Sequence, residues 1–455
     1  MEQKFPVPSL LKEISGYFQN AGFSAYLVGG AVRDFFLKKK ASDWDIATDA
    51  PPQEVMRLFR RTIPTGIEHG TVTIIYKNKH IECTTFRTEA DYTDGRHPAV
   101  VSYAATIETD LARRDFTMNA VAVSLPDGTI VDPFNGRADI RAGRIQTVGS
   151  PIDRFLEDGL RPVRAVRFAA QLGFTVDTGT LQAIPQALHI TKKISIERFR
   201  EEFTKMLASP TPLVGLRLME STGLLNLFIP ELIECRGVGQ GSYHHFDVLE
   251  HSFLVCNACP AGTEHIHIRL AGLFHDIGKP VTRKEAADGS CTFYRHEAIS
   301  EKITRSIMRR LKYSNTEIEK TAHLVAEHMF HYDPSWTDAA VRRFIVRVGK
   351  ENIDDLFALR KADIFGLTGA YAEPNFLVEF TARIDKLLKE DGAYSLKDLA
   401  VNGKDLMAIG IPAGKCLGLV LHDLLETVLD DPAQNTKETL LPIASALYRR
   451  IQRFQ

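Results

Sequence analysis

The spacing of apolar residues divides the chain into two parts. In the first 148 residues short apolar runs alternate with polar turns, and the runs Ala25–Val28, Thr71–Tyr76 and 80–86 are typical of β-strands. A helical pattern over 31–38 follows the first of these strands. From about residue 149 onward almost every segment repeats its apolar positions at helical spacing, with prolines between segments. The pattern predicts an α/β head followed by an all-α remainder.

At 455 residues the chain is long for one hydrophobic core and suggests roughly three domains. The pattern places a head at 1–148, a helical neck at 149–212, a helical body at 213–390 and a helical tail at 391–455. Residues 87–100 are polar and contain Gly and Pro, which predicts a loop within the head.

Composition and charge describe an ordinary globular protein. A net charge of −1 argues against a broadly basic nucleic-acid coat, although a local positive surface is enough for an RNA binder. Six cysteines in a chain of this size do not suggest a disulfide scaffold, and Cys256-x-x-Cys259 lacks the second pair of a zinc finger. No apolar run approaches a membrane span and no charged-then-apolar leader opens the chain, so we expect a cytoplasmic protein.

Two carboxylates and a glycine pair form the first candidate site. Asp43 and Asp45 are two positions apart in a strand-like run, and alternate residues of a strand point to the same face. Magnesium binds through one or two carboxylates and the phosphates of its substrate. Gly29 and Gly30 lie between a strand and a helix, where backbone amides and a helix dipole can meet an anion. The pattern predicts two-metal phosphoryl transfer on a nucleoside triphosphate.

A third carboxylate is expected beside this pair. Glu82 is the candidate, because its strand-like run can pair beside the first carboxylate strand. Arg33 lies one turn into the helix that follows the glycine pair. The alternatives to Glu82 are Asp91, Asp94 and Asp110.

Five segments, in order along the chain, share a resemblance to one family. They are LVGGAVRD with SDWDI (27–46), RRDFTMNA (113–120), DPFNG (132–136), EDGLR (157–161), and Glu197-Arg198 with Glu202. Together they resemble the bacterial-type (class II) tRNA nucleotidyltransferase and poly(A) polymerase family of the polymerase β superfamily. The resemblance implies a polymerase β-like nucleotidyltransferase fold in the head, with a mixed or antiparallel sheet and helices, and Mg²⁺ held by the paired aspartates.

The resemblance also implies roles for single side chains. Arg114 would contact the sugar or phosphate region of the nucleotide, and Asp115 the ribose. Arg164 and Arg167 would contact its phosphate side or support their own helix. Residues 87–100 correspond to a mobile element of the family, which favours a chain that can add the final A.

Base selection is expected on a helix predicted over 157–170, where Asp158 and Arg161 are neighbours. Cytosine and adenine each place an exocyclic amino donor beside a ring-nitrogen acceptor, whereas uracil and guanine reverse that order. A carboxylate that accepts from the amino group and a guanidinium that donates to the ring nitrogen therefore select C and A. The family assigns base recognition to this motif, and Glu197 and Arg198 would instead brace the neck.

A second group of candidate ligands lies in the predicted body. It consists of His251, the doublet His275-Asp276, and Asp363. Adjacent residues of a helix point roughly 100° apart, so both members of the doublet can reach one ion. With HHFDVLEH (244–251) and LFHDIGK (273–279), this group resembles the HD phosphohydrolase superfamily.

The HD resemblance implies a divalent transition metal, such as Mn²⁺ or Ni²⁺, whose identity stays open. His296 and His328 stand where two-metal members carry extra ligands. Such ions lower the pKa of the water that they coordinate, so we expect phosphatase or 2′,3′-cyclic phosphodiesterase activity. The alternative is a body that only binds tRNA and retains the ligands as relics. The tail also resembles the C-terminal region of bacterial tRNA nucleotidyltransferases that carry HD domains.

These resemblances predict an enzyme that adds C, C and A to the 3′ end of tRNA, with tRNA, CTP and ATP as partners. Its oligomeric state stays open, and no membrane partner is expected. The nearer alternatives are an enzyme that adds only A or only CC, and a poly(A) polymerase. Signalling uridylyltransferases also join such a head to an HD domain, but they open on a different glycine-rich motif. The intact Asp43, Asp45 and His275-Asp276 argue against a non-catalytic tRNA-binding protein.

Overall fold

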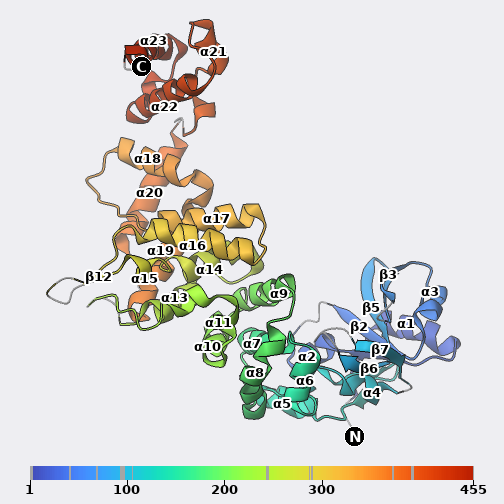
Figure 1. Cartoon of the computed structure of the whole chain (residues 1–455). Helices are drawn as coiled ribbons and strands as arrows, with labels where there is room; N and C mark the ends of the chain where they lie inside the picture. The colour runs from blue at the N-terminus through green and yellow to red at the C-terminus, as the bar shows by residue number, and fades with distance from the viewer. Residues whose placement is uncertain are drawn as a thin grey trace. The chain divides into compact units, whose positions relative to one another are not determined.

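The structure, a computed structural model, separates into two units (Figure 1). The first consists of Met1–Glu234, Ala261–Ile266 and Ile307–Tyr313, and the second of Cys235–Pro260, His267–Ser306 and Ser314–Gln455. The first unit therefore contains the predicted head and neck, and the second most of the predicted body and the tail. The residues described are 4–39, 43–67, 70–92, 98–104, 106–241, 245–285, 287, 291–370, 374–390 and 394–453.

The head is built on one mixed sheet, which the family resemblance implied. Its strand order is β3-β4-β5-β2-β1-β8-β9, and β2 pairs with β5 in parallel while the other neighbours are antiparallel. The strands are β1 (Ala25–Val28), β2 (Trp44–Thr48), β3 (Thr62–Gly66), β4 (Thr71–Tyr76), β5 (Lys79–Thr85), β8 (Ala122–Leu125) and β9 (Ile130–Val131).

Two apolar cores cover the two faces of this sheet. Neighbouring strand residues divide between them: Leu27 and Ile46 belong to one core, whereas Val28 and Ala47 belong to the other. Because side chains alternate along a strand, Asp45 shares the face of Ala47. The alternation therefore places this carboxylate at the edge of the second, smaller core.

The loop predicted over 87–100 is wrong for most of its length. Strands β6 (Arg87–Tyr92) and β7 (Pro98–Tyr103) form an antiparallel hairpin, with Ala90 opposite Val100. The pairing satisfies the backbone groups of both strands, so the polar composition of β6 does not prevent strand formation. Pro98 is the first residue of β7, where no backbone N–H is needed for pairing. Residues 93–97 lie outside the described part of the chain.

Helices make up the rest of the first unit. Two short strands, β10 (Arg144–Ile145) and β11 (Thr175–Val176), pair in parallel. The helices are α1 (Ser9–Asn20), α2 (Gly30–Phe36), α3 (Pro52–Leu58), α4 (Ile107–Ala112), α5 (Gly136–Ala142), α6 (Pro151–Glu157), α7 (Arg161–Leu172), α8 (Thr178–Thr191), α9 (Ile196–Leu207), α10 (Pro212–Thr222), α11 (Leu224–Phe228) and α12 (Pro230–Ile233), with the 3-10 turns η2 (Thr117–Asn119) and η3 (Thr263–His265).

The single helix predicted over 157–170 is wrong at its start. Helix α6 ends at Glu157, Asp158 has extended backbone (φ −137°, ψ 108°), and α7 begins only at Arg161. Pro162 explains the break, because proline fits the first turn of a helix but removes a hydrogen bond from a helix interior. Asp158 therefore lies in the connection, and the helical-spacing argument that paired it with Arg161 does not hold.

Helix α9 is held to α7 by a buried ion pair. The side chains of Glu202 and Arg167 are 6% and 9% exposed, and Glu202 Oε2 accepts from Arg167 Nε at 2.5 Å. Replacing Glu202 by Ala would leave the buried guanidinium without its counter-charge. We expect Glu202→Ala to lower the free energy of unfolding by about 3–5 kcal/mol, measured by chemical denaturation.

The neighbouring Glu201 is exposed on the same helix and provides the matched control. Glu201→Ala should stay within about 0.5 kcal/mol of the unsubstituted protein. A Glu202→Ala protein as stable as this control would contradict the structural role of the pair.

The second unit is helical, as predicted, apart from the short hairpin of β12 (Lys284–Glu285) and β13 (Cys291–Thr292). Its helices are α13 (Val248–Ala258), α14 (Ile266–Phe274), α15 (Lys279–Thr282), α16 (His296–Arg310), α17 (Asn315–Glu327), α18 (Asp338–Val348), α19 (Ile353–Thr368), α20 (Asn375–Lys389), α21 (Gly403–Ala408), α22 (Lys415–Asp430) and α23 (Lys437–Arg453), with η4 (Lys350–Asn352), η5 (Leu396–Asp398) and η6 (Pro432–Gln434). No helix of the described segments is long and apolar enough to cross a bilayer.

Close packing of α13 against α19 positions part of the candidate metal centre. A Cβ atom at Gly366 of α19 would lie 2.5 Å from Val255 Cγ2 and 2.9 Å from His251 Nδ1, both on α13. The absence of a side chain at Gly366 therefore lets the two ligand-bearing helices approach.

Separate apolar cores lie in the body, around Phe344 and Phe380, and in the tail, around Leu424.

Candidate functional site

Three carboxylates gather at the start of β2. The parallel register of β2 and β5 places Asp45 directly opposite Glu82. Asp43 comes just before β2, which begins at Trp44, so the prediction that Asp43 lies within the strand is wrong by one residue. Burial and the charges of Glu82 and Asp43 raise the pKa of Asp45 to about 6, although Arg114 acts to lower it. This crowding of negative charge suits a divalent cation with oxygen ligands.

The alternatives to Glu82 differ from it in position. Asp110 is 1% exposed, and its two oxygens lie 2.7 Å from Arg113 Nη2 and 3.1 Å from Arg114 Nη2. Asp94 and the side chain of Asp91 lie outside the described residues. Among the described candidates, Glu82 is the carboxylate that faces Asp45.

The glycine pair joins β1 to α2, where the sequence placed it. Gly29 has φ 71° and ψ −140°, and a Cβ atom there would lie 3.1 Å from Asp45 Oδ2 and 3.6 Å from Arg114 Nη1. The backbone of Gly29 therefore passes directly over the carboxylate cluster. Gly30 begins α2, and Arg33 lies one turn further along the helix.

A side chain at Gly29 would carry both strain and crowding. We expect Gly29→Ala to destabilise the fold by about 1–3 kcal/mol, because L-residues rarely adopt this backbone conformation. The displaced Asp45 carboxylate should also weaken nucleotide incorporation, by about tenfold. Denaturation and initial-rate assays measure the two effects. Gly16→Ala, whose added Cβ would meet no atom within 4 Å in α1, is the control, and equal behaviour of the two variants would contradict this role of Gly29.

Asp115 is held in its ionised form beside α7. Its Oδ2 accepts from Arg164 at 2.7 Å, and its Oδ1 accepts from the backbone amide of Phe116 at 2.8 Å. Burial acts to raise the pKa of Asp115, but Arg164 and a hydrogen bond from Asn119 outweigh it and lower the pKa to about 2. Asn119 was not assigned a role from the sequence. Its only signal there was its place within the RRDFTMNA segment.

The side chains of the proposed base-selecting residues have other partners, although the Arg161 amide donates to the Asp158 carbonyl at 3.0 Å. Asp158 Oδ2 accepts from Arg198 Nη2 at 2.9 Å. Arg161 instead donates to Glu157 Oε2 at 2.6 Å and to the carbonyl of Arg113 at 2.9 Å. Arg198, expected only to brace the neck, thus contacts the candidate base-binding carboxylate.

The second unit brings all six predicted HD ligands together. The doublet lies in the turn after α14, not within a helix as the sequence argument had it. His251 Nε2 lies 3.1 Å from His275 Nε2, 3.5 Å from Asp276 Oδ2 and 3.2 Å from Asp363 Oδ1. These four groups converge from α13, the turn after α14, and α19.

The other oxygen of Asp276 faces the remaining two histidines. Asp276 Oδ1 lies 3.0 Å from His296 Nε2 and 3.8 Å from His328 Nε2, and the two Nε2 atoms are 3.3 Å apart. His296 begins α16 and His328 follows α17. Asp276 therefore presents one oxygen to each of two ligand groups.

The orientation of these rings fits a cation. The Nδ1 atoms of His275, His296 and His328 lie 2.9, 2.9 and 2.7 Å from the carbonyl oxygens of residues 272, 293 and 325. A carbonyl accepts only from a protonated Nδ1, which leaves the lone pair on Nε2 in the neutral ring. Pairs of Nε2 atoms that face each other near 3 Å suit a shared positive charge, which a metal ion provides.

The protonation of the cluster reflects its buried negative charge. Burial acts to raise the pKa values of Asp276 and Asp363, but His275 and the other neighbouring donors hold both well below their usual range. Burial acts to lower the pKa of His275, but Asp276 and Asp363 outweigh it and raise the pKa to about 10. Burial and the charge of His275 lower the pKa of His328 to about 3.

Lys279 is a second residue to which the sequence gave no role. It is 8% exposed, and its Nζ lies 2.6 Å from Asp276 Oδ2 and donates to Gln240 Oε1 at 2.6 Å. Its place in the LFHDIGK segment is the signal that could have identified it. The ammonium group adds positive charge beside the ligand carboxylate.

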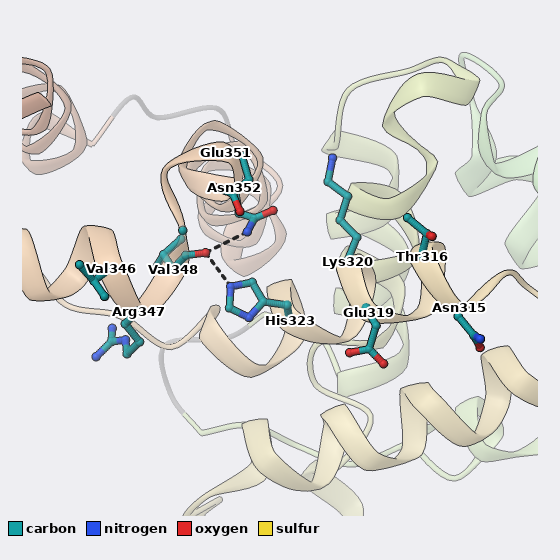
Figure 2. A pocket seen from close by; sticks show the side chains of 11 residues that line it. Asn315, Thr316, Glu319, Lys320, His323, Val346, Arg347, Val348, Glu351 and Asn352 are labelled. Carbon is teal, nitrogen blue, oxygen red and sulfur yellow. Dashed lines mark hydrogen bonds between the residues drawn. The ribbon is translucent and has the colours of Figure 1, made fainter. Parts of the chain in front are cut away.

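A separate pocket of about 780 Å³ lies between α17 and the end of α18 with η4 (Figure 2). The carbonyl of Val348 accepts from Asn352 Nδ2 at 2.9 Å and lies 2.7 Å from His323 Nε2. The charged groups of Lys320 and Arg347 pair with Asp355 and Glu327 at 2.9 Å each. These lining groups are engaged within the protein, and we assign the pocket no function.

Family models match three parts of the chain. Residues 25–146 match the poly A polymerase head domain. Residues 173–235 match the probable RNA and SrmB-binding site of polymerase A, and residues 291–444 match the putative tRNA nucleotidyltransferase domain 2. The matches therefore fall in both structural units.

Whole-chain relatives share one printed name. The chain is 32% identical over 441 residues to the CCA-adding enzyme of Limosilactobacillus fermentum, with 96% of each chain covered. It is 35% identical over 424 residues to that of Geobacillus stearothermophilus, with 92% of each covered. The crystal structure of the Bacillus stearothermophilus CCA-adding enzyme in complex with CTP has a TM-score of 0.73 at 29% identity and covers 99% of this chain and 100% of its own. The Thermotoga maritima CCA-adding enzyme, complexed with tRNA, shares the fold with a TM-score of 0.58 at 20% identity over 96% of this chain and 95% of its own.

Proposed function

Because this chain belongs to the family of CCA-adding enzymes and is a tRNA nucleotidyltransferase, we propose that it adds C, C and A to the tRNA 3′ end from CTP and ATP. The observation that carries this proposal is the register that sets Asp45 opposite Glu82 beneath Gly29. It puts a cation-binding carboxylate cluster beside a glycine turn that a triphosphate can approach closely.

Different residues around the carboxylate cluster are proposed to bind magnesium, the phosphates and the ribose. We propose that Asp43, Asp45 and Glu82 hold magnesium, which when bound supplies Lewis acidity to the tRNA 3′ hydroxyl and the leaving pyrophosphate. The amides of the glycine pair, together with Arg33, would hold the phosphates, Arg114 would contact the sugar or phosphate region, and Asp115 the ribose. Arg164 and Arg167 would support these contacts from α7, where both are already engaged by carboxylates.

Base selection is proposed for Asp158 and Arg161 at the junction of α6 and α7. The Asp158 carboxylate would accept from the exocyclic amino group of C or A, and the Arg161 guanidinium would donate to the ring nitrogen. Uracil and guanine would leave these polar groups without partners, which disfavours them strongly. Arg198 already orients Asp158, so α9 contributes to the geometry of the base site.

The experiment that tests the function uses tRNA transcripts that end before CCA, after C and after CC, each with a single nucleotide. We expect CTP to extend the first two transcripts and ATP only the third. Addition restricted to A or to CC, or continued A addition to a complete CCA end, would replace the proposal with the corresponding alternative. Transfer of labelled UTP to a protein acceptor would favour the signalling class.

We also propose a second activity, phosphoester hydrolysis, at the HD cluster. His251, His275, Asp276 and Asp363 would hold one divalent transition metal, and Asp276, His296 and His328 a second. Such ions supply Lewis acidity for hydrolysis of phosphomonoesters or 2′,3′-cyclic phosphodiesters. The support is the convergence of four Nε2 atoms and two carboxylates at 3.0–3.8 Å in the second unit.

A further inference from the structure

One residue, Asn119, contacts three of the residues proposed to bind nucleotide, two of them through its side-chain amide. Asn119 ends η2 and is 7% exposed. Its Oδ1 accepts from Arg33 Nη1 at 3.0 Å, and its Nδ2 donates to Asp115 Oδ1 at 3.2 Å. Its backbone carbonyl accepts from Arg114 Nη1 at 3.4 Å. Asn119 thus contacts the two proposed nucleotide-binding arginines and the proposed ribose ligand.

The chemistry of these partners requires an amide. The Arg33 guanidinium offers only donors, and the ionised Asp115 carboxylate only acceptors. An amide carries one acceptor and one donor on a rigid planar group, so it satisfies both neighbours at once and its orientation is fixed by them. A carboxylate at this position would accept from Arg33 but repel Asp115.

Each of the three partners is also held on its other side. Arg33 donates to Asp34 Oδ1 at 2.8 Å, and its guanidinium carbon lies 5.3 Å from the ring centroid of Phe168 in α7. Asp115 is held by Arg164 and Arg114 by Asp110. The position of Arg33 relative to Asp115 therefore depends on the Asn119 amide, which contacts both.

We infer that Asn119 is a positioning residue whose side-chain amide fixes Arg33 and Asp115 in one arrangement for the incoming nucleotide. The inference rests on the proposed nucleotide addition. Asn119 acts through its neighbours and touches no substrate itself. Its loss should therefore raise the KM for CTP and ATP, whereas the KM for tRNA should not change.

The sharpest variant is Asn119→Asp, which keeps the shape and replaces the donor by an acceptor. At pH 8 two carboxylates would lie about as close as the present contact, and the KM for both nucleotides should rise by about tenfold to a hundredfold. Steady-state kinetics on a transcript ending in CC, with ATP varied, and on one ending before CCA, with CTP varied, measure this rise.

The pH dependence separates a positioning role from mere packing. Like charges at this distance raise the pKa of one carboxyl group of the pair. That group therefore takes up a proton at a higher pH than an isolated carboxyl group does. A protonated carboxyl group can donate to its neighbour and accept from Arg33, as the amide does. The nucleotide KM of Asn119→Asp, divided by that of the unsubstituted enzyme at the same pH, should therefore be smaller at pH 6 than at pH 8.

Two further variants complete the test. Asn226→Asp, at an exposed position of α11, adds the same charge and should leave all KM values unchanged. Asn119→Ser adds no charge and cannot span both partners, so its nucleotide KM should rise without the recovery at low pH, and it decides the question if Asn119→Asp does not fold. Unchanged nucleotide KM values, or an equal rise in the KM for tRNA, would overturn the inference. An unsubstituted enzyme that extends no transcript would instead overturn the proposed function, and this inference with it.

Discussion

Asp45→Asn is expected to reduce incorporation of both CTP and ATP into tRNA by about 10³-fold. The substitution keeps the shape of the side chain and removes the charge that faces Glu82 across the β2–β5 register. A neutral amide is a poor magnesium ligand beside a triphosphate, so the transferred phosphate loses its electrostatic support. Single-turnover extension of transcripts ending before CCA and after CC measures the loss.

The denaturant concentration at which Asp45→Asn unfolds distinguishes loss of magnesium binding from loss of the fold. The folded-state pKa of Asp45 is raised to about 6, so its ionised form is disfavoured in the folded protein and costs stability above that pH. Asp45→Asn removes this cost, and the variant should unfold at the same or higher denaturant concentration at pH 8. Asp153→Asn, exposed in α6, should leave both activity and stability unchanged. More than a tenth of normal activity in Asp45→Asn, or a loss explained by unfolding, would contradict the proposed magnesium site.

Asp276→Asn should abolish the metal binding and the hydrolytic activity proposed for the second unit, while nucleotide addition continues. The carboxylate presents Oδ2 to His251 and His275 and Oδ1 to His296 and His328, and an amide has only one oxygen to offer. We expect bound transition metal to fall from about two ions per chain to near zero, and phosphodiester hydrolysis to fall by about 10³-fold. Metal analysis after reloading and hydrolysis of a 2′,3′-cyclic nucleotide measure both.

The control for this variant is His331→Ala, an exposed histidine of the same unit. It should retain metal and both activities. An unsubstituted protein that takes up no ion after incubation with Mn²⁺ or Ni²⁺ would refute the metal centre. A folded Asp276→Asn protein that also lost nucleotide addition would refute the assignment of the two activities to two separate sites.

The sequence predicted those features that depend on local pattern. Alternating apolar residues identified β4 and β5, and the glycine pair between β1 and α2 marked the turn over Asp45. Residue types and motif context selected the six candidate HD ligands, and the structure brings their side chains together, even though the helix assumed for the doublet is a turn.

Features that depend on contacts between residues distant in the sequence were not predicted. The hairpin of β6 and β7 has a polar first strand, and only its pairing reveals it. Helical spacing suggested that Asp158 faces Arg161, but a new helix begins at Arg161 with Pro162 in its first turn. Arg198 of α9, 40 residues further along the chain, contacts Asp158 instead. Asn119 could not be assigned because its role follows from the donors and acceptors that surround it in space.

The three histidines whose Nδ1 atoms lie near carbonyl oxygens each use a carbonyl three residues earlier in their own segment. These local contacts orient the three rings without a bound ion. Ion binding would therefore require little reorientation of the side chains. If the proposed metal centre binds ions, a chelator should therefore remove them from a protein that keeps its tertiary structure.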